Sequence, residues 1–141
     1  MWTATYEKTF KNISKEQIWS AWSDVSSWPK WDKELEEVKI DGAFAVGNKF
    51  TLKPKGGPKV SIFITEVKPL KVFTDYTAFP LAKMFDYHEL EETSEGLKIK
   101  SKIWIEGPLS WLWRKIVAEN VASGVPAQLE LLVEYAKQNK N

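Results

Sequence analysis

The sequence contains no cysteine and only one histidine among its 141 residues. The lack of cysteine excludes a disulfide framework and thiol chemistry, and with a single histidine the usual zinc sites are excluded as well. Twenty basic and nineteen acidic side chains leave a net charge of +1, which provides no overall field to attract nucleic acid or an anionic membrane. We therefore predict no metal, no cofactor and no nucleic-acid partner.

Long apolar runs are also missing. No stretch approaches the roughly 20 apolar residues that a membrane-spanning helix needs, and the N-terminal MWTATYEKTF has no basic region leading into an apolar one. These observations predict a soluble cytoplasmic protein without stable membrane insertion. The length suits one core and no linker interrupts the chain, so we expect a single domain over residues 1–141.

The first third of the chain predicts one strand followed by two short helices. Residues 2–10 are rich in threonine and aromatic residues, which favours a strand. Ser14 and Gln17 stand at capping-box spacing before the first helix, and Pro29 suits the first turn of the second. The tryptophans at 28 and 31 are typical of core packing, with a stacking platform for a ligand as the alternative.

The rest of the chain predicts a sheet and one long helix. Between about residues 34 and 106, apolar segments alternate with turn signals such as KPKGGPK and TSEG, which indicates six antiparallel strands. From Leu109 onward, apolar residues recur at helical spacing to the C-terminus, and Pro126 should kink that helix. An apolar sheet face needs a cover, and the long helix is available to provide it.

Five strings carry a family resemblance. Taken in order, IWSAWSDVSSWPKWD, GAFAVGNKF, FITEVKP, DYHELEETSEGLKIKS and GVPAQLELLVEYAK resemble the polyketide cyclase/dehydrase branch of the SRPBCC, or START-like, superfamily. The resemblance spans nearly the whole chain. It implies an α+β helix-grip fold, in which a seven-stranded antiparallel sheet wraps the long C-terminal helix around a cavity for a small hydrophobic or amphipathic molecule. Because this superfamily includes enzymes, carriers and receptors, the fold alone names no reaction.

Strand alternation predicts which polar side chains face that cavity. In GLKIKSKIWIE, Ser101 and Ile103 share the apolar face, while Trp104 shares the lysine face and points outward. Pairing back through the TSEG hairpin places Met84, Asp86 and His88 inward as well. Three inward polar groups should satisfy one another, hold water or receive a ligand. A slip of one residue in the hairpin would instead expose His88 and bury Tyr87.

Asp86 and His88 are the candidate catalytic residues, as a pair that abstracts or relays a proton. The alternative is that His88 is only a hydrogen-bonded residue of the cavity wall. Residues two apart on a strand lie about 7 Å from one another, which argues against a proton shared directly.

The candidate ligand-binding residues are mostly apolar. Turns at one end of the meander should bring Phe79, Leu81, Trp111 and Trp113 together as a rim around the cavity mouth. Lys55, Lys59 or Lys83 would suit an acidic head group there, and the alternative is that these residues only close the domain. The full predicted set is Phe63, Phe79, Leu81, Met84, Ser101, Ile103, Trp113, Val117 and Val121.

Three functions remain open from the sequence. We favour a carrier or sensor that binds a small hydrophobic or amphipathic molecule, as a monomer or homodimer. The second is a cyclase or dehydratase that uses His88 and Asp86, and the third is an interaction module that acts through the outer sheet face around Trp104.

Overall fold

The computed structural model describes residues 2–138, and its main element is an antiparallel sheet of seven strands in the order β1-β7-β6-β5-β4-β3-β2. The six-strand meander predicted between residues 34 and 106 is confirmed. The first strand pairs with the last and forms one edge of the open sheet. The strands are β1 (Thr3–Phe10), β2 (Leu35–Ile40), β3 (Lys49–Pro54), β4 (Val60–Lys68), β5 (Val72–Phe79), β6 (Ala82–Thr93) and β7 (Gly96–Glu106).

Two short helices connect β1 to β2. They are α1 (Lys15–Ser23) and the 3-10 helix η1 (Val25–Lys30). Pro29 is the last residue but one of η1, so the prediction that it lies in the first turn was wrong. The predicted capping box is present, because the Ser14 side chain accepts from the Gln17 backbone and the Gln17 side chain accepts from the Ser14 backbone. The first helix therefore begins where the sequence predicted, shortly after the edge strand β1.

The C-terminal helix starts with irregular winding. One α-helical turn, α2 (Ser110–Trp113), leads into a π-helical turn, η2 (Arg114–Ala118), and then into α3 (Glu119–Gln138). The helix continues through Pro126, so the proline does not end it, and the kink expected there stays a prediction. Departure from α-helical winding occurs earlier, in η2, and π turns of this kind are frequent at functional sites.

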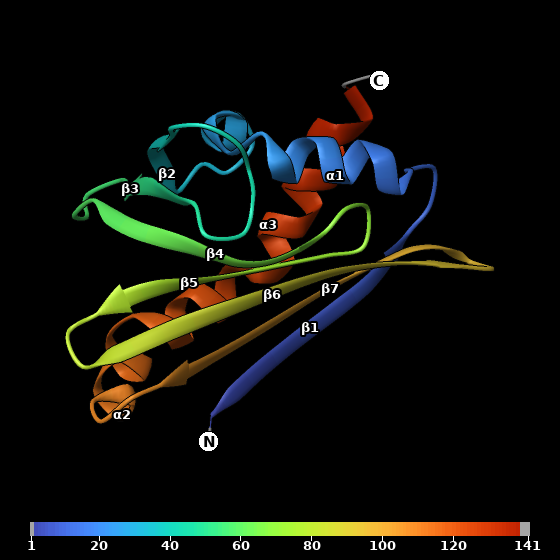
Figure 1. The fold of residues 1–141 in the computed structure, drawn as a ribbon. Helices are drawn as coiled ribbons and strands as arrows, with labels where there is room; N and C mark the ends of the chain where they lie inside the picture. The colour runs from blue at the N-terminus through green and yellow to red at the C-terminus, as the bar shows by residue number, and fades with distance from the viewer. Residues whose placement is uncertain (1, 139–141) are drawn as a thin grey trace.

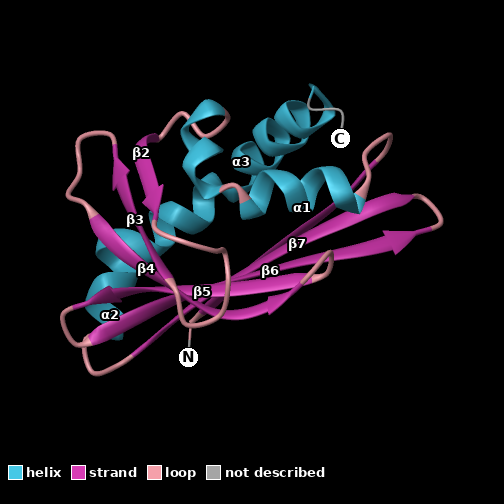
Figure 2. Ribbon diagram, turned by 45° about the horizontal axis from the view of Figure 1, so that its top comes forward, coloured by secondary structure: helices cyan, strands magenta, loops and turns pink. Residues whose placement is uncertain are grey.

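The helices form one layer against one face of the sheet. In both views α1 and α3 lie on the same side of the strands, with α3 running diagonally across them (Figures 1 and 2). Side-chain hydrogen bonds join α3 to the segment between β1 and β2: Gln128 Nε2 donates to Asp32 Oδ2 over 2.9 Å, and Gln17 Nε2 donates to the Ala136 carbonyl over 3.3 Å. This is the helix-grip arrangement that the sequence predicted.

The register of the β6–β7 hairpin decides which residues face the helices. Leu90 pairs with Ile99, and His88 pairs with Ser101, as predicted. Leu90, Ile99 and Ile103 are buried in the core, so the face they share is the inner face. The one-residue slip that would have turned His88 outward does not occur.

The core is rich in aromatic side chains. Trp28 and Trp31 are 9% and 6% exposed, and the Trp28 indole donates to the carbonyls of Ala21 and Trp22. Trp28 also packs edge-on against Phe50 at 5.3 Å between ring centroids. The prediction that these two tryptophans belong to the core is confirmed.

Candidate functional site

A polar cluster lies on the inner face of the two central strands β6 and β7. His88 Nε2 is 3.3 Å from Asp86 Oδ1, and the Ser101 hydroxyl donates to the same oxygen over 3.4 Å. The two side chains bend toward each other, so they lie closer than the spacing of residues two apart on a strand led us to expect. The predicted trio therefore does come together, and its members satisfy one another.

The surroundings of His88 fix its ring and its tautomer. Its Nδ1 lies 3.2 Å from the Phe73 carbonyl, which can only accept, so Nδ1 carries a hydrogen. The ring stacks on Phe73 at 3.8 Å between centroids and meets the edge of Trp22 at 5.4 Å. Nε2 then faces Asp86 Oδ1 at 3.3 Å, so a proton bound by either atom lies between the two groups. This arrangement can pass a proton between the two groups.

The polar cluster keeps solvent-accessible surface although it lies on the inner face of the sheet. The side chains of His88 and Asp86 keep 15% and 25% of their surface accessible, whereas the flanking inner-face residues Met84 and Leu90 are buried. A side chain on the inner face of a central strand is accessible only where the helical layer does not seal it. The interior is therefore open at this point.

Asp75 on β5 is a further member of the cluster, and the sequence analysis did not identify it. It pairs directly with Asp86 across β5 and β6, and it is only 6% exposed. Burial, and next the charge of Asp86, raise the pKa of Asp75 well above its ordinary value. Burial also raises the pKa of Asp86, while His88 and the Ser101 hydrogen bond act in the opposite direction.

These raised pKa values predict a dependence of stability on pH. At a pH below the ordinary aspartate pKa of about 3.9, both the folded and the unfolded chain hold the protons. As the pH rises through that value toward the raised folded pKa, only the unfolded chain releases them, so the carboxyl pair lowers the free energy of unfolding. The loss amounts to about 1.4 kcal/mol for each unit of pKa difference.

Asp75→Asn isolates this effect, because the amide resembles the protonated carboxyl group. We expect the variant to be more stable than the wild type at pH 7, with the difference shrinking toward pH 4. Urea denaturation at several pH values measures it, and Asp41→Asn on the exposed β2–β3 loop is the control. A difference between Asp75→Asn and wild type that stays constant across this range would contradict the prediction.

Four aromatic rings and His88 form a continuous group beside the cluster. Phe73 packs edge-on against Trp19, Trp22 and Phe44, with ring centroids 6.3, 5.1 and 5.2 Å away. Phe44 comes from the loop between β2 and β3 and so brings that loop onto the interior. The walls around the polar cluster are thus largely aromatic.

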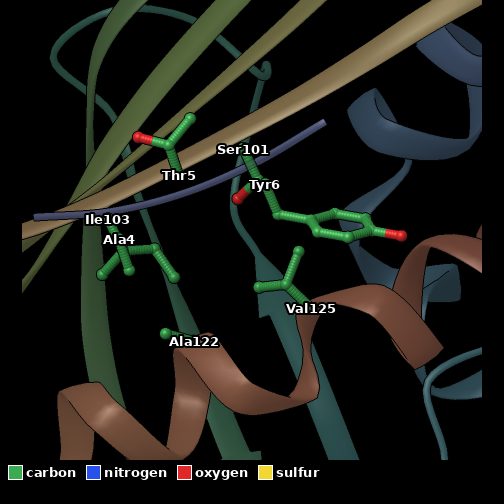
Figure 3. A pocket seen from close by; sticks show the side chains of 7 residues that line it. All are labelled: Ala4, Thr5, Tyr6, Ser101, Ile103, Ala122 and Val125. Carbon is green, nitrogen blue, oxygen red and sulfur yellow. The ribbon is translucent and has the colours of Figure 1, made fainter. Parts of the chain in front are cut away.

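The enclosed space is smaller than the chamber that the family resemblance implied. A pocket of about 40 Å³ lies between β1, β7 and α3, with Ser101 and Ile103 on the sheet side and Ala122 and Val125 on the helix side (Figure 3). Pockets for small molecules usually enclose roughly 300 to 1,000 Å³. The pocket between β7 and α3 is well below that size, so a molecule of the expected class needs more room than this pocket gives.

Two of the four predicted rim residues, Phe79 and Trp113, are in contact at one end of the sheet. Trp113 stacks on Phe79 at 4.6 Å between centroids, and its indole donates to the Pro80 carbonyl over 2.9 Å. Leu81 and Trp111 are 64% and 58% exposed. A groove of about 380 Å³ beside them is lined by Ala78, Phe79, Leu81, Ala82, Lys83, Glu106, Gly107 and Pro108.

Most of the other predicted ligand-binding residues face the interior, and one does not. Met84 and Ile103 are buried on the inner face, and Val117 and Val121 pack against the core from the helical layer. Phe63 lies on the outer face, because its neighbours Ile62 and Ile64 are the buried ones, and it stacks on Tyr76 at 5.0 Å. Assigning Phe63 to the cavity was wrong.

The outer face carries a row of four aromatic side chains. Trp104 points outward as predicted and stacks on Phe85 at 5.1 Å, and Tyr76 links Phe85 to Phe63. Lys83 also lies on this face, with its Nζ 4.8 Å from the Tyr76 ring centroid. Because Lys83 also lines the groove beside the rim, its contact with a head group at the mouth stays a prediction.

The described residues contain neither a candidate membrane span nor a candidate metal cluster. Between residues 2 and 138, no helix has both the length and the apolar character needed to cross a bilayer. In that range no group of three or more histidine, aspartate or glutamate side chains is arranged to hold a metal ion.

A family model described as polyketide cyclase / dehydrase and lipid transport matches residues 1–137. The chain belongs to this family. The assignment confirms the resemblance predicted from the sequence. No curated protein matches the chain significantly.

Solved structures share the fold at low sequence identity. Protein MLL2253 from Mesorhizobium loti is 18% identical with a TM-score of 0.76, and the match covers 99% of this chain and 100% of that one. Ara h 8.0201 is 18% identical with a TM-score of 0.69, covering 98% and 100%. Norcoclaurine synthase from Thalictrum flavum, solved with dopamine and hydroxybenzaldehyde, is 14% identical with a TM-score of 0.68, covering 99% and 90%. At these identities the likeness establishes the helix-grip fold.

Proposed function

We propose that this member of the family binds a small hydrophobic or amphipathic molecule between the sheet and α3, as a carrier or sensor. The observation that carries the proposal is the solvent-accessible polar cluster of Asp86, His88 and Ser101 within an otherwise apolar interior. Ligand pockets combine these two features, because apolar walls give affinity and a few polar groups fix orientation. The family description, which includes lipid transport, supports the same function.

The C-terminal helix has features that suit the movement a ligand requires. The π turn η2 lies where the helix approaches the sheet, and Gly124 and Pro126 follow within α3. Glycine and proline both weaken a helix interior, by roughly 1 and 3 kcal/mol relative to alanine. The half-buried side chains of Val117, Val121 and Ala122 lie along this weakened part. We infer that the ligand enters by moving this half of the helix outward.

Filling the pocket from the helix side tests this function. Ala122 lines the pocket, whereas Ala127 is exposed on the same helix. Ala122→Phe should weaken binding of decan-1-ol about tenfold or more, since the new ring occupies the ligand's place. Ala127→Phe, with the same change of side chain, should bind like the wild type. Isothermal titration calorimetry measures both affinities.

Two outcomes of that experiment contradict the proposal. Equal affinities in Ala122→Phe and Ala127→Phe would exclude the space between β7 and α3 as the binding site. A wild-type protein that binds none of decan-1-ol, decanoate and decylamine would exclude the function itself.

A further inference from the structure

We propose that the ligand carries a protonated amine and that the facing carboxyl groups of Asp75 and Asp86 receive it. This inference rests on the proposed function and narrows it to cationic amphipathic molecules. The groups that would accept hydrogen bonds from the amine are the carboxyl groups of Asp75 and Asp86, which are paired directly on the inner face of β5 and β6.

The structure provides fewer cations than carboxyl groups at this place. Within residues 2–138, His88 is the only basic side chain that lies within ion-pairing distance of Asp86, and none lies that close to Asp75. Asp75 also receives no side-chain hydrogen bond from the described residues, although it is 94% buried. A buried carboxyl group without a partner costs free energy, and a ligand that provides the missing donor recovers it.

The buried pair resists double ionisation when no ligand is present. Two carboxylates this close repel each other, and burial removes the water that would stabilise their charges. The raised pKa values of both groups reflect this. An ammonium group placed between them permits both to ionise, and each then accepts a charge-assisted hydrogen bond.

The accessible surface leads to the carboxyl groups in a definite order. The Asp86 side chain is 25% exposed, whereas Asp75 is 6% exposed. On this basis we expect a ligand head group to reach Asp86 more easily than Asp75.

An acidic head group does not fit this environment. The sequence placed Lys55, Lys59 or Lys83 at the mouth for such a group, and Lys83 lines the groove at that end of the sheet, on the outer face and not beside the carboxyl pair. A carboxylate ligand would meet two carboxyl groups against one imidazole, that of His88, and like charges at such a distance repel. The charge of the interior thus favours amines over acids.

Three ligands with the same chain and different head groups test the inference. Calorimetry at pH 7 compares decylamine, decan-1-ol and decanoate with the wild-type protein. We expect decylamine to bind about 30-fold more tightly than decan-1-ol. The alcohol leaves the buried carboxyl groups without a cationic partner, which costs about 2 kcal/mol or more. Decanoate should bind more weakly than decan-1-ol.

Asp75→Asn and Asp86→Asn show whether the carboxyl groups cause that preference. Each variant should reduce the ratio of decylamine to decan-1-ol affinity about tenfold or more, because one charge partner is lost. Asp41→Asn removes an exposed carboxyl group and should keep the wild-type ratio. Circular dichroism verifies that each variant is folded, and two independent variants protect the result against the misfolding of one.

The outcomes separate this inference from the proposed function. If decan-1-ol binds but decylamine shows no advantage, or if decanoate binds best, the amine inference is wrong and the binding function stands. A decylamine preference that survives in both asparagine variants also overturns the inference, since the preference then arises elsewhere. If none of the three ligands binds, both proposals fail.

Discussion

Phe73→Ala is expected to lower the free energy of unfolding by about 3 to 5 kcal/mol, the cost of truncating a fully buried phenylalanine. Phe73 has no exposed surface, and its ring contacts those of Trp19, Trp22, Phe44 and His88. It therefore joins α1, the β2–β3 loop and β6 at one point. No side chain next to it can fill the cavity without leaving its own contacts.

Phe63→Ala is the matched control for this variant. Both residues are phenylalanines of central strands, but Phe63 is half-buried on the outer face, where it stacks on Tyr76. Its replacement should cost only about 1 kcal/mol, which is typical of an aromatic pair at the surface. Guanidinium denaturation measures both variants. Similar costs for the two would mean that the interior aromatic group does not stabilise the fold.

The Phe73→Ala variant should also free the His88 ring from its stacked position. Because the chain contains one histidine, its imidazole signals in an NMR spectrum need no assignment by mutation. Loss of the stacked ring at 3.8 Å should move these signals toward the values of an unstructured histidine. Unchanged signals in a folded Phe73→Ala protein would contradict the description of the site.

The sequence contained enough information for the fold and for half of the candidate site. Alternation in β7 is unambiguous, because lysines occupy one face, and it placed Ser101 inward and Trp104 outward. The order of elements and the Ser14 capping box followed from local chemistry in the same way. These features depend on residues close together in the chain, and single-sequence patterns describe such residues well.

Other parts of the site depend on long-range register or on volume. Asp75 lies in VFTDYTAF, where alternation with Phe73 indicates an inward side chain, but its approach to Asp86 follows only from the β5–β6 pairing. Phe63 stands between Ile62 and Ile64, so three consecutive apolar residues gave no signal for one face. The size of the cavity depends on where α3 settles, and no residue pattern encodes that distance.

Gly96→Ala is expected to destabilise the protein by about 3 kcal/mol or more, through backbone strain combined with a steric clash. Gly96 has φ +142°, a conformation that residues with a Cβ atom rarely adopt. A Cβ built at this position would overlap the carbonyl oxygen of Phe10, at the end of β1. The end of β1 and the β6–β7 turn can therefore lie this close together only with glycine at position 96.

Gly47→Ala separates the two causes. Gly47 also has a positive φ, of +91°, but no atom lies within 4 Å of a Cβ built there. Its replacement should cost only about 1 to 2 kcal/mol, from backbone strain alone. Equal losses in the two variants would mean that the contact with Phe10 imposes no constraint.

The loss at Gly96 bears on the site because this turn sets the register of β6 against β7. Thr93 pairs with Gly96 at the turn, and the same register pairs His88 with Ser101 farther along. A shift by one residue turns His88 outward and Tyr87 inward, which dissolves the cluster. In the Gly96→Ala variant that remains folded, the NMR signals of His88 report the outcome directly. Wild-type signals mean that the pairing of the long strands, rather than the glycine turn, holds the carboxyl groups and the imidazole in place.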